Sequence, residues 1–242
     1  MAPAGIGDRV EGLHAVRAAV AAGRVTHLFV LEAVAKKETE LLQAVQAREG
    51  VVDVLDDLAG IAETSAPQGV VARARPIPTV ELRALVKDRP ALVVLDHLED
   101  VGNVGAIART ATAAGMTGMV VASRRAAPLG PGVFKASAGA LESLPVATLS
   151  SVADAVVELR DVGIWTVGLE ARAEASIFGL ELLAEPVALI IGAEGSGLAR
   201  LVRERVDVLA RVPMATETES LNASVAAAIA MYEVLRVRSE LD

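Results

Sequence analysis

The chain has 242 residues, of which 53% are hydrophobic and none is cysteine. This length suits one large or two modest domains, and the lack of cysteine excludes disulfides, thiolate metal sites and a cysteine nucleophile. No stretch approaches the roughly 18 apolar residues that a membrane helix needs, and residues 1–9 hold no apolar segment behind a basic start. We therefore predict a cytoplasmic protein without a membrane partner.

The formal net charge is −8, from 23 basic and 31 acidic residues, and aromatic residues make up only 2% of the chain. An acidic total argues against nucleic acid, because RNA affinity depends largely on neutralising phosphates, although a local basic patch matters more than the sum. Few aromatic residues argue against a base-stacking surface. An RNA ligand would therefore be held through phosphates and shape. The candidate cations for such contacts are Arg9, Arg17, Arg24, Arg124, Arg125 and Lys135.

The first third of the chain alternates between helix and strand patterns. Apolar residues at helical spacing predict helices over 10–22 and 36–48, the first ending at Gly23. Short apolar runs predict strands over 26–31, 51–54 and 69–73. We expect a small α/β domain over residues 1–75, followed by a linker over 76–90 in which three prolines fall among scattered charges.

From residue 91 onward, strand and helix patterns alternate regularly. Several of the strands are continuous apolar runs, which is typical of a parallel sheet covered on both faces. The expected strands cover residues 91–95, 118–122, 164–169, 187–191 and 208–212, and a last helix covers 221–238. These patterns predict a parallel α/β domain over 91–242.

Ligands of open α/β sheets bind at the carboxyl ends of strands, and three loops there carry polar or glycine-rich sequences. The first follows the strand 91–95 and contains Asn103, which can cap a helix, and Arg109 six residues later. An ordinary helix cap followed by a surface arginine explains the same residues.

The second loop, Gly192-Ala193-Glu194-Gly195-Ser196-Gly197, follows the strand 187–191. Its glycines imply tight backbone geometry and close approach to a ligand. Their order is G-x-x-G-x-G rather than the G-x-G-x-x-G of dinucleotide-binding loops, and a pyrophosphate would be repelled by Glu194. The carboxylate suits a hydroxyl or amine ligand, although a plain turn or a helix cap explains the loop equally well.

The third loop follows the last strand and places Ser220, Asn222 and Ser224 at the start of an alanine-rich helix. A cluster of N-cap residues is the simpler interpretation of these three side chains. Each loop alone is a weak signal. Together, in this order on this frame, the three loops indicate one site.

The three loops resemble the three motifs of the SpoU family of RNA 2′-O-ribose methyltransferases, within the SPOUT superfamily. These motifs read N-x-G-x-x-x-R, I-I-G-A-E-G-x-G-L and V-P-M-x-x-x-x-E-S-L-N-x-S-V-A-x-A. The segments 135–140 and 11–16 are also similar to family features, the latter in the small ribosomal-protein-like domain of many members. The resemblance spans nearly the whole chain and is greatest to the branch that modifies a guanosine of 23S ribosomal RNA.

The resemblance implies a parallel-sheet domain with a C-terminal trefoil knot, S-adenosylmethionine as cofactor, an RNA substrate, a homodimer and no metal. It places cofactor contacts on Gly192, Val212, Met214, Ser220 and Leu221. Catalytic and substrate contacts fall on Asn103, Arg109, Glu194, Ser220 and Asn222.

In the implied reaction, a ribose 2′-hydroxyl attacks the sulfonium methyl group in line. The family mechanism gives Arg109 the task of taking the proton of the hydroxyl, with help from an RNA phosphate. Arg109 as an orienter of the hydroxyl and a phosphate clamp, with phosphate or water taking the proton, explains the same residue, because a neutral guanidine is costly. The chain departs from the family at Val101, Ala215 and Ala223, where proline, glycine and valine are common. An alanine where the backbone needs a positive φ would cost about 1 kcal/mol.

Other functions remain open at this stage. A transfer-RNA methylase, a resistance methyltransferase acting on a ribosomal adenosine and a non-catalytic RNA-binding relative all fit the same motifs. The glycine order disfavours a nicotinamide-dependent oxidoreductase.

Overall fold

The computed structural model describes residues 5–215 and 220–240. The chain packs as two compact units. Unit 1 comprises Met1–Thr79 together with Pro128–Ser143, and unit 2 comprises Val80–Ala127 together with Leu144–Asp242. Among the described residues, no helix is both long enough and apolar enough to cross a bilayer.

Unit 1 is built on a four-stranded sheet of order β1-β4-β2-β3, in which only the β2–β3 pair is parallel. Helices α1 and α3 pack against each other and against this sheet. The strands are β1 (Arg9–Glu11), β2 (Val25–Leu31), β3 (Val51–Leu55) and β4 (Val70–Ala74). The helices are α1 (Leu13–Ala21), α2 (Glu32–Ala35), α3 (Thr39–Gln46), α5 (Pro131–Ala136) and the 3₁₀ turn η2 (Ala140–Glu142).

Two helices predicted for this unit are wrong in part. The helix predicted to begin at Val10 begins at Leu13. Val10 lies in β1 and pairs with Ala72 of β4, and Gly12 turns the chain at φ +86°. The helix predicted over 36–48 is the shorter α3, which begins at Thr39 because the backbone of Glu38 is not helical, and the short helix α2 precedes the predicted range. Strand pairing has overridden the apolar spacing in the first case.

The 128–143 segment lies between two strands of unit 2 in sequence but packs within unit 1. Val133 and Phe134 are fully buried, and the Phe134 ring lies where a Cβ on Gly7 would stand, only 2.3 Å from it. A Cβ on Gly139 would lie 2.4 Å from the Ala18 side chain of α1, so both glycines permit close packing.

Unit 2 contains a seven-stranded sheet of order β7-β6-β5-β10-β8-β11-β9, in which every neighbouring pair is parallel. Its strands are β5 (Ala91–Asp96), β6 (Gly118–Ala122), β7 (Val146–Leu149), β8 (Trp165–Leu169), β9 (Ala175–Ser176), β10 (Val187–Gly192) and β11 (Val208–Arg211). Its helices are α4 (Val101–Ala113), α6 (Val152–Asp161), α7 (Arg200–Arg205) and α8 (Ala223–Ser239), with 3₁₀ turns η1 (Leu82–Leu85) and η3 (Glu181–Ala184).

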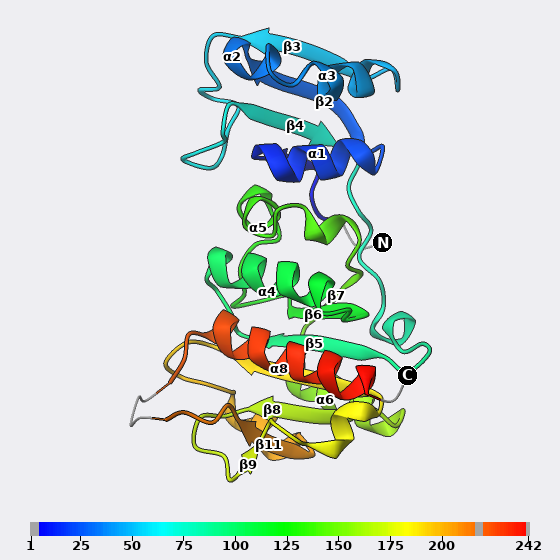
Figure 1. Cartoon of the computed structure of the whole chain (residues 1–242), viewed down its shortest axis with the longest axis vertical. Helices are drawn as coiled ribbons and strands as arrows, with labels where there is room; N and C mark the ends of the chain where they lie inside the picture. The colour runs from blue at the N-terminus through cyan, green and yellow to red at the C-terminus, as the bar shows by residue number, and fades with distance from the viewer. Residues whose placement is uncertain (1–4, 216–219, 241–242) are drawn as a thin grey trace. The chain divides into compact units, whose positions relative to one another are not determined.

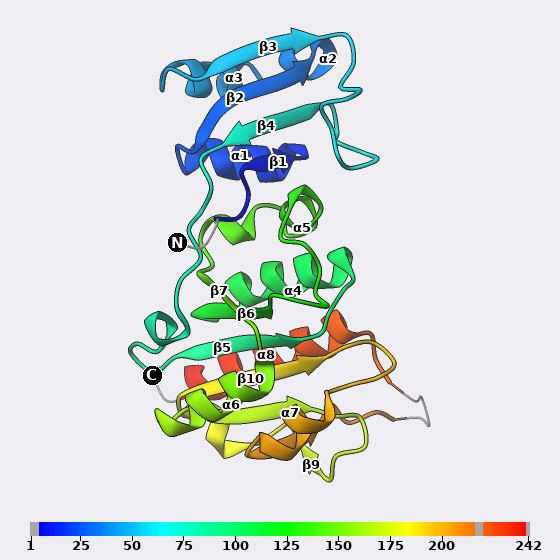
Figure 2. The same ribbon diagram turned by 180° about the vertical axis from the view of Figure 1, so that it is seen from behind.

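The sheet of unit 2 is covered on both faces, as the apolar strands predicted. Helices α4 and α8 pack together on one face (Figure 1), and α6 and α7 pack together on the other (Figure 2). All of β5 and β6 is buried, and β10 is buried from Val187 to Ile191. The five predicted strands are present, each within one residue of its expected ends, whereas β7 and β9 were not predicted.

The segment expected to be a linker, 76–90, is packed along much of its length. Ile77 pairs with Ile6, and Val80 forms a parallel bridge to Ala147. Leu82 and Leu85 of η1 belong to the hydrophobic core of unit 2. Its prolines restrict the backbone angles of the segment, whereas Leu82 and Leu85 attach it to the core of unit 2.

The strand order reverses direction between β5 and β10, which positions the functional site. The chain runs from β5 to β6 and β7 on one side, then to β8 on the other, and β10 fills the space between β5 and β8. Such a reversal leaves a crevice outside the carboxyl ends of the strands. Gly192 pairs with Asp96 there, so the first two polar loops begin side by side.

Candidate functional site

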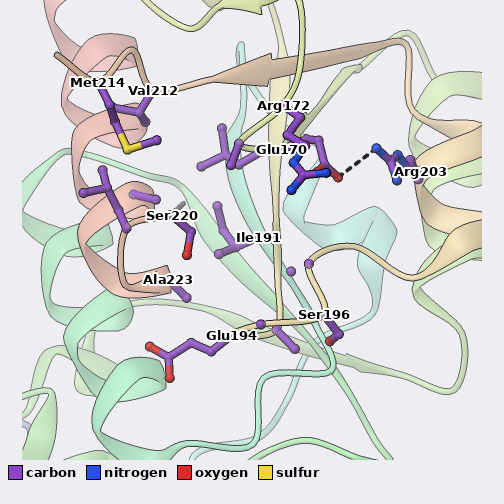
Figure 3. Close-up of a pocket in the computed structure, with 18 residues that line it drawn as sticks. Glu170, Arg172, Ile191, Glu194, Ser196, Arg203, Val212, Met214, Ser220 and Ala223 are labelled. Atoms are coloured by element: carbon purple, nitrogen blue, oxygen red, sulfur yellow. Dashed lines mark ion pairs between the residues drawn. The ribbon is translucent and has the colours of Figure 1, made fainter. Parts of the chain in front are cut away.

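A cavity of about 430 Å³ opens at the carboxyl ends of β8, β10 and β11, a size within the range of small-molecule sites (Figure 3). Its walls come from the loop after β8, the glycine loop after β10 and the segment that leads from β11 to α8. All five residues expected to contact the cofactor line it: Gly192, Val212, Met214, Ser220 and Leu221.

Gly192 forms a wall of the cavity that admits no side chain. A Cβ at this position would lie 2.3 Å from the carbonyl carbon of Gly197 and 2.5 Å from the amide nitrogen of Leu198. The loop folds back on itself through hydrogen bonds between Ala193 and Gly197 in both directions, at 3.1 and 2.9 Å. Gly195 and Gly197 adopt φ angles of +77° and +67°. The three glycines therefore serve the close return of the loop toward the end of β10.

Asn222 joins the three motifs. Its Oδ1 caps α8 by accepting hydrogen bonds from the amides of Ser224 (2.9 Å) and Val225 (3.3 Å), which fixes the orientation of the side-chain amide. The Nδ2 group therefore faces away from the helix, where it donates to Asn103 Oδ1 at 3.0 Å and to Glu194 Oε1. Three residues that lie 28 to 119 positions apart in sequence form one hydrogen-bonded cluster.

Asn103 does not cap α4, contrary to our expectation. The cap is Asp100, whose Oδ1 accepts the Asn103 amide at 2.7 Å, and Asn103 is the third residue of the helix. Its side chain is buried and is directed toward Asn222. Since its Oδ1 accepts from Asn222, its Nδ2 hydrogens are left to donate elsewhere. The helix begins at Val101, before Asn103, because the Asp100 side chain caps it by accepting the Asn103 amide.

The structure separates Arg109 from the cavity. Arg109 lies on α4 and is exposed, and it is not among the residues that line the cavity. By contrast, Glu194 and Ser220 line it. Val101 is the first residue of α4, the position where proline is favoured, and Ala215 does not adopt a positive φ. Ala223 is the first residue of α8, so none of the three departures from the family pattern places a side chain at a positive φ.

Sequence reasoning missed the charged side of the cavity. Glu170, Arg172 and Arg203 all line it, the first two in the loop after β8 and the third on α7. Glu170 Oε2 and Arg203 Nη2 are 3.5 Å apart (Figure 3). The rule that ligands bind beyond the carboxyl ends of strands would have directed attention to this loop.

Asp96 links the end of β5 to Ala199, which follows the glycine loop. It is fully buried at the end of β5, where its Oδ2 accepts the Ala199 amide at 2.7 Å and its Oδ1 contacts His97 Nδ1 at 2.6 Å. It thereby holds the start of α7 against β5. Within the described residues, no group of three or more histidine, aspartate or glutamate side chains is placed to hold a metal ion.

Three of the four basic residues proposed for RNA in unit 1 are paired with carboxylates. Arg9 contacts Glu63 at 2.7 Å, and Arg17 contacts Glu38 at 2.6 Å. Arg24 is largely buried, and it forms two hydrogen bonds with Glu142 at 2.5 and 2.7 Å. Including Arg24 in the RNA surface was therefore wrong, because burial and pairing leave its charge neither free nor accessible.

Arg124 and Arg125 are in a different situation. Both are exposed in the loop after β6, and in the described part of the chain neither forms an ion pair. A hydrogen bond of 2.8 Å from the Ala127 amide to the Leu98 carbonyl holds this loop beside the loop that leads to α4. Lys135 is half-buried in unit 1, on α5.

A parallel α/β sheet with a glycine-walled cavity at the carboxyl ends of its strands is the arrangement in which α/β proteins bind cofactors and nucleotides. Comparison with known proteins is more specific. The sequence matches the SpoU rRNA methylase family over residues 90–232 and the RNA 2′-O ribose methyltransferase substrate-binding family over residues 9–80.

Relatives and solved structures agree with this match. The TrmH family tRNA/rRNA methyltransferase YacO of Bacillus subtilis is 44% identical over 73% of either chain. The SpoU methyltransferase AviRb of Streptomyces viridochromogenes, solved with AdoMet, superposes with a TM-score of 0.80 at 31% identity, covering 96% of this chain and 90% of that one. The AdoMet-bound rRNA methyltransferase of Sinorhizobium meliloti gives a TM-score of 0.78 at 27% identity, covering 94% and 86%. The chain belongs to the SpoU rRNA methylase family and is an RNA methyltransferase.

Proposed function

We propose that the protein transfers a methyl group from S-adenosylmethionine to a ribose 2′-hydroxyl of RNA, most specifically to a guanosine of 23S ribosomal RNA. The observation that carries the proposal is the cluster of Asn222, Asn103 and Glu194 beside the glycine-walled cavity. The cavity supplies a place for the donor, and the cluster supplies polar groups for a hydroxyl substrate.

The cavity fits S-adenosylmethionine in size and in lining. Apolar side chains of Ile191, Val212 and Met214 form one part of it and suit a purine ring, and Leu221 also lines the cavity. Gly192 lets a ligand approach the backbone, because no side chain can occupy that wall. When bound, this cofactor supplies an electrophilic methyl group on a sulfonium centre.

The residues of the chain would bind and orient the nucleophile. Asn103 has an amide nitrogen free to donate to a ribose oxygen, while Asn222 holds the Asn103 side chain in place. Arg109 would hold a phosphate and orient the hydroxyl, with phosphate or water accepting the proton, since an arginine is a poor base. The carboxylate of Glu194 keeps Asn222 oriented toward the cluster.

The homodimer remains a prediction, and α8 supports it. This helix buries Ala227, Met231 and Val234 in its own unit, yet Tyr232 and Leu235 on other faces are exposed. A helix that is apolar on several faces usually packs against more than one neighbour. Because Arg109 lies on α4, which packs against α8, pairing through α8 would bring an arginine of one subunit near the interface. The trefoil knot also stays a prediction, supported by the insertion of β10 between β5 and β8.

The substrate is tested by labelled methyl transfer. Full-length protein is incubated with radiolabelled S-adenosylmethionine and, separately, with 23S ribosomal RNA fragments and a transfer-RNA pool, and the modified nucleotide is mapped by resistance to alkaline hydrolysis. Label on a 23S guanosine supports the full proposal. Label on transfer RNA or on a ribosomal adenosine keeps the reaction but replaces the substrate. No binding of the donor to folded protein would support a non-catalytic RNA-binding role.

A further inference from the structure

The cavity has an apolar part and a charged part, and the proposed function assigns only the first. Val212, Met214 and Ile191 lie apart from Glu170, Arg172 and Arg203, which gather near the loop after β8 (Figure 3). A wholly apolar ligand would make no ionic or hydrogen-bonded contact with the two guanidinium groups and the carboxylate in this part of the cavity wall. The charged part of the cavity is therefore suited to a charged group of the ligand.

Hydrogen bonds that involve backbone groups fix the two elements that carry these charged residues, the turn after β8 and helix α7. The Glu170 amide donates to Ala210 at 3.0 Å, and its carbonyl accepts from Ala173 at 3.0 Å, so the turn that carries Arg172 is fixed to β11. Arg203 extends from α7, a helix that is anchored by buried Val202 and by the contact of Asp96 with the Ala199 amide. These side chains can therefore define a site rather than follow a mobile loop.

The charged groups do not satisfy one another. The 3.5 Å between Glu170 Oε2 and Arg203 Nη2 is longer than the roughly 2.7–2.9 Å of a charge-assisted hydrogen bond. Arg172 is exposed and forms no ion pair with any described residue. Glu170 Oε2 faces Gly197, where a Cβ would lie 3.9 Å away, so the carboxylate borders the glycine loop. Two cations and one anion with spare hydrogen-bonding capacity thus face one space.

We infer that Arg172 and Arg203 bind the α-carboxylate, and Glu170 the α-ammonium, of the amino-acid moiety of the methyl donor. This inference rests on the proposed function and makes these three residues determinants of donor specificity. A zwitterion matches the set because guanidinium groups are shaped to bind carboxylates, whereas a carboxylate accepts from an ammonium group. Neither group touches the transferred methyl, so these are binding residues and not catalytic ones.

The experiment compares ligands that differ only in the amino-acid moiety. The full chain is titrated calorimetrically with S-adenosylhomocysteine, which carries that moiety, and with 5′-methylthioadenosine, which lacks it but keeps the adenine and ribose. The variants are Arg172→Ala, Arg203→Ala and Glu170→Gln. The control is Arg200→Ala, on the same helix as Arg203 but outside the cavity and paired with Glu204.

We expect wild type to bind S-adenosylhomocysteine more tightly than 5′-methylthioadenosine. Each variant should lose about 10- to 100-fold in affinity for S-adenosylhomocysteine, as for one charge-assisted hydrogen bond, with 5′-methylthioadenosine unaffected. Arg200→Ala should change neither. If Arg203→Ala disturbs α7, Arg203→Gln keeps the length of the side chain and serves in its place.

Two results would overturn the inference alone. Equal loss for both ligands would place these residues at the ribose or adenine, and unchanged affinity for S-adenosylhomocysteine would remove them from the site. If folded wild-type protein bound neither compound, the proposed function would fail as well. The outcomes are therefore distinguishable.

Discussion

The two units of the chain use buried polar groups for different purposes. In unit 1 the buried charged groups are satisfied internally, whereas the buried Thr79 Oγ1 has no hydrogen-bond partner among the described residues. Glu11 is fully buried and accepts hydrogen bonds from the amides of Glu63 and Thr64 at 2.6 and 3.0 Å, and Arg24 is paired with Glu142. In unit 2 the buried Asn103 uses only its Oδ1 in side-chain hydrogen bonds with the described residues, accepting from Asn222 beside the cavity. Burial of a charge alone is therefore no sign of a binding site, and a buried amide with an unused donor is the better candidate for one.

The comparison also changes how the units can be separated experimentally. Deleting the residues before Pro78 would not be a clean test of RNA docking. Because Val133, Phe134 and Leu141 of the 128–143 segment are buried within unit 1, such a deletion would expose them. Point substitutions are therefore the better way to test the difference between the units.

The largest expected effect falls on chemistry in unit 2. Arg109→Ala should lower turnover by about 10²–10⁴-fold, the usual range for a group positioned for proton transfer, while leaving donor affinity unchanged because Arg109 does not line the cavity. Single-turnover methylation and donor titration measure the two quantities. Arg83→Ala, an exposed arginine paired with Glu158, is the control. Near-normal turnover in Arg109→Ala would remove this residue from the mechanism.

A comparable effect, on stability rather than activity, is expected in unit 1. Glu142→Ala leaves the largely buried Arg24 without its partner, which should lower the free energy of unfolding by about 3–5 kcal/mol. Denaturant melts measure the loss. The double variant Arg24→Met with Glu142→Leu should recover much of it, because no unpaired charge remains. Loss of donor binding in folded Glu142→Ala would contradict the division of roles between the units.

A smaller loss is expected when the cluster in unit 2 is altered without disturbing the helix cap. Asn222→Asp can still cap α8, but it turns a carboxylate toward Glu194 and loses the donor to Asn103. Turnover should fall by about 10- to 100-fold, the cost of a hydrogen bond to a charged group. Ser224→Ala, which contacts Asn222 only on its cap side, is the control. Equal losses in both variants would mean that the cap, and not the cluster, matters.

RNA affinity should distinguish free cations from paired ones. Removing Arg124 or Arg125 should each reduce the slope of log affinity against log salt by about 0.7–0.9, as for one lost phosphate contact. Arg17→Ala should change the slope little, because its charge is already neutralised by Glu38. Filter binding at several salt concentrations measures the slopes. A larger change for Arg17→Ala would return the principal RNA surface to unit 1.

The smallest effect concerns pH. Hydrogen bonds from the Arg236 guanidinium lower the pKa of Glu233, whose Oε1 also accepts the Gly179 amide at 2.9 Å. A lowered pKa in the folded state stabilises the protein above the ordinary carboxyl pKa, and this contribution is lost as pH falls through the folded value. Glu233→Gln should therefore be less stable than wild type at pH 7, by no more than about 1 kcal/mol because the arginine of the pair is half-exposed, with the gap closing in acid. Melting temperatures from pH 7 to pH 3 measure the gap, and a constant gap would argue against the ionised pair.

Part of this protein can be predicted from sequence because the information is local. The strand over 118–122 has the predicted ends, since five apolar residues between turns can be recognised without knowing their neighbours. Gly192, Val212 and Leu221 line one cavity, as the family resemblance implied, because the motifs that carry the resemblance are short segments. The position of these loops at strand ends was enough to place them at one edge of the sheet.

The remainder depends on contacts between residues far apart in the chain. Arg24 and Glu142 are separated by 118 positions, and nothing in either neighbourhood distinguishes Arg24 from a free surface cation. Strand β1 exists because β4 pairs with it, and the 128–143 segment packs in unit 1 because buried surface there accepts Phe134. The charged side of the cavity likewise arises only when the loop after β8 and helix α7 meet. Local patterns determine which elements form, but the free energy of burial and pairing between distant elements determines which charges are neutralised and which remain available to a ligand.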